Sequence, residues 1–130
     1  MPTMTPEQSR SIAKLYSDLA SALADYRFTH WAELSKAQRA EIESHEWTLL
    51  TYSSNMAARS IRLAGAESAT ALAGITRATK RLTAAVRRVA SVKRAFAIAT
   101  SAVTLGGAIA SGHALAIGEA VSEALSVADG

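Results

Sequence analysis

A segment without charged residues constrains this chain more than any other feature of its sequence. From Ala95 to Gly118 the chain contains no Asp, Glu, Lys or Arg. A continuous helix of that length would extend about 36 Å, which is enough to cross a hydrocarbon core of about 30 Å. The same segment would also suit a buried seam between closely packed helices in a soluble assembly. The sequence leaves both interpretations open.

The composition of this segment supports each interpretation in part. Lysines and arginines precede it and only acids follow it, which fits a span whose N-terminal end faces the cytoplasm. However, Leu, Ile, Val and Phe are sparse in it, and His113 would be costly near the centre of a bilayer. Small residues recur at every fourth position, so that helix backbones can approach closely there. The predicted helix-packing and oligomer seam consists of Ala102, Gly106, Ala110, Ala114 and Gly118.

Helical periodicity predicts an all-α chain. A capping box that begins at Thr5, followed by apolar residues at helical spacing, predicts a first helix over residues 6–28. A second capping box begins at Ser35 and predicts a helix over residues 36–64, with Gly65 as its stop. The apolar spacing continues into a third, strongly amphipathic helix predicted over residues 67–95.

The rest of the chain is rich in Ala and Gly and is expected to form one long helix or two short ones. Gly106-Gly107 and Ser111-Gly112 are the two candidate turns. We therefore expect four or five helices, arranged in an antiparallel bundle or in extended helical hairpins. A chain of 130 residues is most simply one domain. That domain, 1–130, would comprise a charge-balanced helical hairpin (1–66), a basic amphipathic helix (67–95) and an Ala/Gly-rich helical segment (96–130).

Charge is distributed unevenly along the chain, although the net charge is only +3. The segment from Ser68 to Gly118 contains bases and no acid, whereas the residues after it carry only acids. Such a basic helix suits a solvated outer face, the phosphate backbone of a nucleic acid, or anionic lipid headgroups. The candidate residues for binding an anionic partner are Arg77, Lys80, Arg81, Arg87, Arg88 and Arg94.

No pattern in the sequence indicates a catalytic or metal site. Glu41 and His45 are four residues apart and would share a helical face, but a catalytic zinc usually needs three protein ligands. The chain has neither a Gly-x-Ser-x-Gly elbow nor a phosphate-binding loop, and the absence of Cys excludes disulfides and thiolate zinc sites. We therefore expect a non-enzymatic protein without a cofactor, a metal or a small-molecule substrate.

Trp31 and Trp47 are the only tryptophans. Each would either anchor a helix in the core or lie at a boundary between water and lipid. Core packing is the commoner use of tryptophan, and we expect it for both residues.

These features together predict a self-associating helical protein. The first hypothesis is a membrane-associated protein that uses the Ala/Gly-rich segment and the basic helix, as a small pore, permeabiliser or anchor. The alternative is a soluble structural subunit, such as a coat or scaffold protein, whose basic helix contacts nucleic acid. A third hypothesis is a plain helical bundle that binds a partner protein. The expected partners are further copies of the chain, and an anionic membrane surface or a nucleic acid. Because no basic stretch followed by an apolar run opens the chain, we expect no cleaved signal peptide and a cytoplasmic or membrane-associated location.

Overall fold

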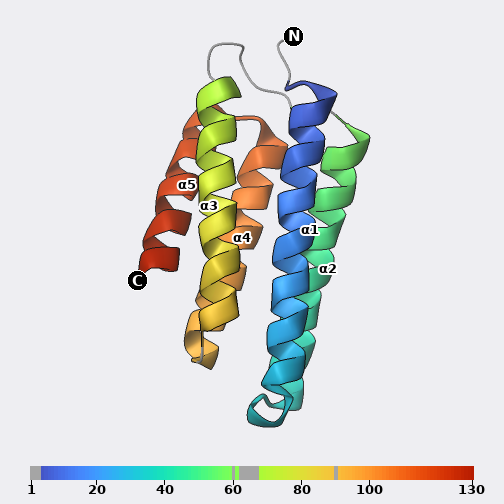
Figure 1. Ribbon diagram of the computed structural model, residues 1–130, viewed down its shortest axis with the longest axis vertical. Coiled ribbons are helices and arrows are strands. Elements are labelled where there is room, and N and C mark those ends of the chain that lie inside the picture. Colours follow the sequence, from blue (N-terminus) through green and yellow to red (C-terminus); the bar gives the residue numbers. More distant parts are fainter. Residues whose placement is uncertain (1–3, 60, 62–67, 90) are drawn as a thin grey trace.

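The computed structural model describes residues 4–59, 61, 68–89 and 91–130. These residues form five α-helices and one short 3-10 helix, and they contain no strand. Consecutive α-helices run in alternating directions along one long axis, so the predicted all-α bundle is confirmed (Figure 1). The elements are α1 (Pro6–Thr29), the 3-10 helix (Trp31–Glu33), α2 (Lys36–Ala58), α3 (Ser68–Arg88), α4 (Val92–Ser111) and α5 (Ala114–Asp129).

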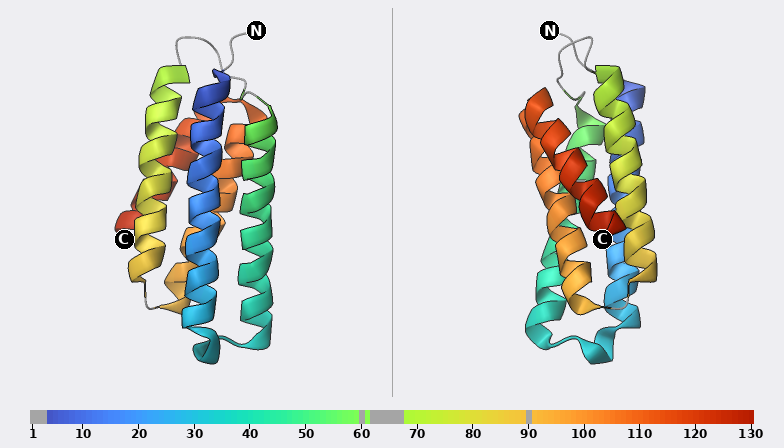
Figure 2. Two further views of the ribbon diagram at one scale, coloured as in Figure 1. Left: turned by 45° about the vertical axis from the view of Figure 1, so that its right-hand side comes forward. Right: turned by 90° about the vertical axis from the view of Figure 1, so that its left-hand side faces the viewer.

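The helices share one hydrophobic core. α1 packs against α2 and α3, α4 packs against α2, α3 and α5, and α5 packs against α3 and α4 (Figure 1 and Figure 2). α5 buries mostly alanines, so it approaches its neighbours closely. Most of the large side chains that are fully buried come from α1 to α4, and they include Ile12, Tyr16, Leu19, Leu23, Ile42, Leu49, Ile75, Leu82, Ile98 and Leu105.

Both predicted capping boxes are present. The Thr5 hydroxyl accepts a hydrogen bond from the Gln8 N–H at 3.1 Å, and the Gln8 side chain accepts one from the Thr5 N–H at 2.9 Å. Ser35 and Gln38 make the same pair of bonds at the start of α2. Because each box satisfies two otherwise unpaired N–H groups, it fixes the first turn of its helix.

The second helix ends earlier than predicted. α2 stops at Ala58, and Arg59 is already extended. The predicted end at Ala64 is therefore wrong, and Gly65 itself lies outside the described residues. The physical reason is a tertiary contact of Ile61, whose N–H donates to the Ser9 hydroxyl at 2.9 Å and whose C=O accepts from the Met4 N–H at 2.8 Å.

The predicted third helix is in fact two helices. α3 ends at Arg88 and α4 begins at Val92, so the prediction of one helix over residues 67–95 is wrong. Ser91 is extended, and its hydroxyl accepts a hydrogen bond from the Arg94 N–H at 3.4 Å. This cap begins a new helix, because an N-cap residue has non-helical dihedral angles.

The two candidate turns of the Ala/Gly-rich segment are now distinguished. α4 continues through Gly106 and Gly107, whereas Gly112 lies after its end in the left-handed region, with a φ of 72°. Glycine adopts that conformation without the steric cost of a Cβ. The segment from Ala95 to Gly118 is therefore not one continuous helix, since the chain reverses at Gly112.

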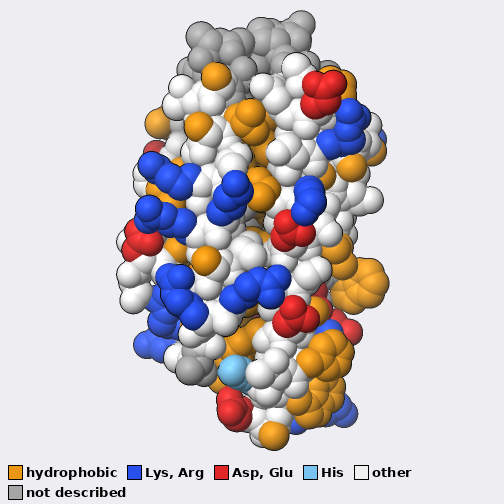
Figure 3. Space-filling view, in the orientation of Figure 1, with side chains coloured by type: hydrophobic (Ala, Val, Ile, Leu, Met, Phe, Trp, Pro, Cys, Tyr) orange, Lys and Arg blue, Asp and Glu red, His pale blue; other side chains and the backbone are white. Residues whose placement is uncertain are grey.

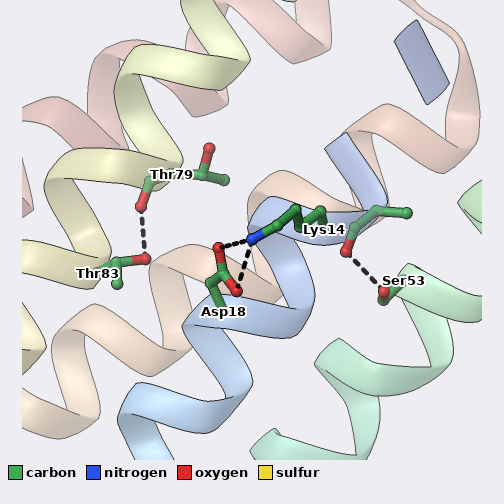
Figure 4. Close-up of polar contacts among 6 residues, drawn as sticks. Lys14, Asp18, Ser53, Thr79 and Thr83 are labelled. Atoms are coloured by element: carbon green, nitrogen blue, oxygen red, sulfur yellow. Dashed lines mark hydrogen bonds and ion pairs between the residues drawn. The ribbon is translucent and has the colours of Figure 1, made fainter. Parts of the chain in front are cut away.

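Polar side chains on the packed faces bond mostly to the backbone. The Thr83 hydroxyl donates to the Thr79 C=O at 2.9 Å within α3, and the Ser53 hydroxyl of α2 donates to the Ala13 C=O of α1 at 2.6 Å (Figure 4). Such bonds offset the cost of burying hydroxyl groups. The Ser53 bond also fixes the register of α2 on α1.

We expect the fold to lose stability above about pH 10 because of Tyr16. Its hydroxyl is buried and donates to the Ala102 C=O of α4 at 3.1 Å. Burial, with a smaller effect from Tyr52, raises the pKa of Tyr16 in the folded state. The unfolded chain therefore ionises first, so this contribution is complete below about pH 10 and is lost as the pH rises further.

Urea unfolding from about pH 8 to about pH 11 would check this expectation. Tyr16→Phe should be less stable than wild type at the lower pH, because it lacks the bond to Ala102, but should lose less stability as the pH rises. Parallel stability curves for the two proteins would contradict it.

Candidate anionic-partner interface

The outer side of α3 presents a continuous set of bases. All five charged residues of α3 are basic and exposed, and small residues such as Ala73 and Ala84 are exposed among them. Lys and Arg side chains gather on this side of the molecule (Figure 3). We call this surface the basic face; it consists of Arg77, Lys80, Arg81, Arg87 and Arg88.

Part of the predicted basic set is engaged within the chain. Arg81 pairs with Asp129 at 2.8 Å and Arg87 pairs with Asp25 at 3.5 Å. All four of these side chains are more than half exposed, so each ion pair is worth little and can be exchanged for another partner.

The other predicted bases differ from these two. Arg94 belongs to α4, is half-buried and donates to the Ala128 C=O at 3.4 Å, so it fastens the end of α5. Arg77, Lys80 and Arg88 are exposed and form no ion pair with any residue that the structure describes. These three bases are the ones most available to an external anion.

The predicted small-residue seam is divided between two helices. Ala102 and Gly106 are buried in α4, and Ala110 is exposed near its end. A Cβ added at Gly106 would overlap the ring of Tyr52 in α2, with Cε2 only 2.5 Å away. Ala102 and Gly106 therefore serve packing inside one chain.

The remaining members of the seam, Ala114 and Gly118, lie on α5. Ala114 is half-buried and Gly118 is exposed, and a Cβ added at Gly118 would meet no atom within 4 Å. Gly112 separates them from the α4 members, so the five residues do not form one stripe.

α4 is the one helix, among the residues the structure describes, that is long and apolar enough to cross a membrane by length and composition. Within its most apolar stretch, 44% of the residues are buried in the bundle. The core helix of a bundle has the same composition, so this property alone does not identify a span.

Aromatic side chains of the α1–α2 hairpin are exposed at two places: Phe28 and Trp31 lie at its end, and Trp47 lies half-way along α2. Trp47 is 65% exposed and Trp31 is 45% exposed, so the expectation of core packing is wrong for both. The reason for Trp47 is its position on α2, two residues before the buried Leu49 and so on the opposite side of the helix. Trp31 lies on the 3-10 helix, where its ring stacks on an exposed neighbour, Phe28.

The stack continues through two arginines. The rings of Phe28 and Trp31 are parallel to within 7°, with centroids 6.0 Å apart. Arg27 lies over the ring of Phe28, and Arg39 lies over the ring of Trp31 at 4.4 Å from its centroid. The sequence analysis did not predict this stack of two arginines and two aromatic rings. The high density of Arg and aromatic residues between Tyr26 and Arg39 could have indicated it.

Nothing in the described part of the chain brings together three or more His, Asp or Glu side chains that could hold a metal ion. His30 contacts the ring of Tyr26 and lies 3.5 Å from Glu33, whereas His45 is half-buried on α2. Glu41 is exposed. No candidate catalytic centre is apparent among these groups.

The chain matches no protein-family model, no curated protein and no solved structure.

Proposed function

We propose that this is a non-enzymatic binding protein that attaches to the anionic surface of a membrane through the basic face. The observation that carries the proposal is the set of five exposed bases on one side of α3, with no acid in that helix. Near an anionic membrane surface each Lys or Arg is worth about 1 kcal/mol. Several bases on one rigid helix would act together.

The exposed aromatic group supplies a second reason to favour a membrane. Trp and Phe side chains are typical of the boundary between lipid headgroups and the hydrocarbon core. Phe28, Trp31 and Trp47 are exposed, and arginines lie beside two of them. Arg39 can keep its charge among the headgroups while the Trp31 ring beside it enters the interface, whereas Arg27 stays paired with Glu46.

This proposal does not need the Ala/Gly-rich segment to cross the bilayer. The apolar side of α4 faces the bundle, where Ile98, Ala102 and Leu105 are buried. Exposing that side to lipid would require the bundle to open. Attachment at the surface would leave the bundle intact.

The alternative is a soluble assembly subunit whose basic face contacts the phosphate backbone of a nucleic acid. The same bases would serve it, because phosphates are the target in both cases. The basic face carries no aromatic residue on which a base could stack, and this favours the membrane.

Lys80→Gln combined with Arg88→Gln should weaken binding to vesicles that contain phosphatidylserine by about thirtyfold, because each lost charge costs about 1 kcal/mol. Sedimentation with vesicles would measure this at low and high salt, and binding should weaken as salt screens the charges. Emission from Trp31 and Trp47 should also shift to shorter wavelength on binding.

The matched control is Lys36→Gln with Arg59→Gln, which removes two exposed bases from outside α3. It should bind nearly as well as wild type if the basic face, and not net charge, is responsible. Duplex DNA tested in parallel separates the two partners. Salt-sensitive DNA binding without vesicle binding would contradict the membrane proposal and support the assembly subunit.

A further inference from the structure

An open apolar groove lies between the N-terminal halves of α3 and α5. It has a volume of about 770 Å³. Half of its lining residues are alanine or glycine, among them Ala71 and Gly74 from α3, and Ala114 and Gly118 from α5. At these positions little side chain covers the backbone, so another helix or a large apolar side chain could approach it closely.

Leu115 stands at the edge of this groove. Its side chain is 77% exposed, the largest exposure among the large apolar residues that the structure describes. Because Leu115 projects from the wall of the groove, its side chain and the apolar surface of the groove are both exposed to water. Exposed apolar surface next to a concave apolar surface is typical of an interaction site.

The two helices that form the groove carry opposite charges. Arg77 lies on the α3 side and lines the groove. Glu119 and Glu123 are exposed on α5, and Glu119 follows Leu115 by one helical turn. None of these three side chains forms an ion pair within the described residues. Any occupant must therefore meet a base along one side and acids along the other.

We propose that the occupant is a second copy of this chain, related by a twofold axis that runs along the groove. In a twofold interface the same patch is used by both subunits. With the axis in this direction, α3 of one copy lies over α5 of the other, so Arg77 of one copy faces the Glu119–Glu123 pair of the other. Each copy places its Leu115 over the groove of its neighbour.

Other occupants fit the charges less well. A uniformly acidic peptide or an anionic lipid would be attracted by Arg77 but repelled by Glu119 and Glu123. A basic partner would meet the opposite problem. A second copy supplies both complementary charges, and attraction at two symmetric places adds to the burial of Leu115. This inference uses Arg77 of the basic face but none of its other four bases.

Sedimentation velocity of the full chain over a wide range of concentration would test the interface. Wild type should form a dimer, and Leu115→Ser should raise the dimer dissociation constant by about tenfold or more, because it removes a central apolar contact. The control is Leu50→Ser, which changes an exposed leucine of α2 outside the groove and should leave the dimer unchanged. A wild type that stays monomeric, or a dimer that Leu115→Ser leaves intact, overturns the proposal.

Charge reversal tests the direction of the axis. Arg77→Glu alone, and Glu119→Lys with Glu123→Lys, should each weaken the dimer, since like charges would then face each other. The three changes together in one chain should restore it, because the attraction is rebuilt with reversed sign. All these positions are exposed, so helicity should be unchanged throughout. If the combined variant does not recover dimer formation, the pairing of α3 with α5 is wrong.

Discussion

Gly106→Ala is expected to lower the free energy of unfolding by about 1–3 kcal/mol, and Gly106→Leu by more. Gly106 is buried in α4 against the ring of Tyr52, where an added Cβ would overlap the ring and lie 2.5 Å from Cε2. The ring cannot easily withdraw, because it packs edge-on against Tyr16, with the ring centroids 6.2 Å apart. Tyr16 is itself fully buried. One added methyl group must therefore displace two aromatic side chains or separate α2 from α4.

The next residue provides a matched control. A Cβ at Gly107 would meet only the Tyr52 hydroxyl at 3.6 Å, which is an ordinary contact. Gly107→Ala should therefore stabilise the helix by about 0.5–1 kcal/mol, through the higher helix propensity of alanine. Urea unfolding of both variants should show shifts of opposite sign. Tyr52→Leu should recover part of the loss in Gly106→Ala, whereas equal stability of the two alanine variants would contradict the close packing at Gly106.

The helix starts could be predicted from the sequence because they depend on neighbouring residues. The capping boxes at Thr5 and Ser35 involve side chains and N–H groups only three residues apart. The end of α1 was predicted to within one residue, whereas the end of α2 could not be predicted, because it depends on contacts between distant segments. α2 ends where Ile61 bonds to Ser9 and Met4, and these partners are more than fifty residues away in the chain.

The break between α3 and α4 was missed for a different reason. Apolar residues at helical spacing resume on the far side of the break, with Phe96 partly buried against the core. The periodicity therefore continues although the backbone does not. The cap at Ser91 was a local signal, but it was weaker than the apolar pattern that surrounded it.

The surfaces were predictable to different degrees. The exposure of Lys80 and Arg88 follows from their spacing on an amphipathic helix, so the basic face could be identified from the sequence. The groove could not, because it exists only where α5 lies beside α3, and that arrangement depends on the turn at Gly112. Gly106, the other candidate turn, instead continues α4 and packs against Tyr52.

Removing the carboxylate of Glu46 is expected to lower the free energy of unfolding by about 3–5 kcal/mol. Glu46 in α2 and Arg27 in α1 form two hydrogen bonds, Nε to Oε2 at 2.7 Å and Nη2 to Oε1 at 3.1 Å. The two side chains are only 11% and 9% exposed. The hydrogen bond from the Arg27 guanidinium to Glu46 raises the pKa of Arg27. Arginine stays protonated in proteins even without such a partner, so Arg27 would remain charged after the carboxylate of Glu46 is removed. A buried, unpaired cation is the main source of the expected loss.

A double-mutant cycle would measure the interaction energy between Glu46 and Arg27, apart from the cost of each single substitution. Glu46→Leu and Arg27→Met alone should each destabilise strongly, whereas the double variant should lose much less than the sum, since neither charge is left without a partner. The exposed pair of Lys14 and Asp18 provides the control, and Asp18→Asn should cost less than about 1 kcal/mol. A Glu46 variant no less stable than Asp18→Asn would contradict the argument from burial.

Because Arg27 also lies 4.6 Å from the centroid of Phe28, losing Glu46 should release this arginine and disturb the aromatic stack at the hairpin end. A weaker blue shift of tryptophan emission on vesicles for Glu46→Leu would then connect the buried pair to the surface that we propose meets the membrane.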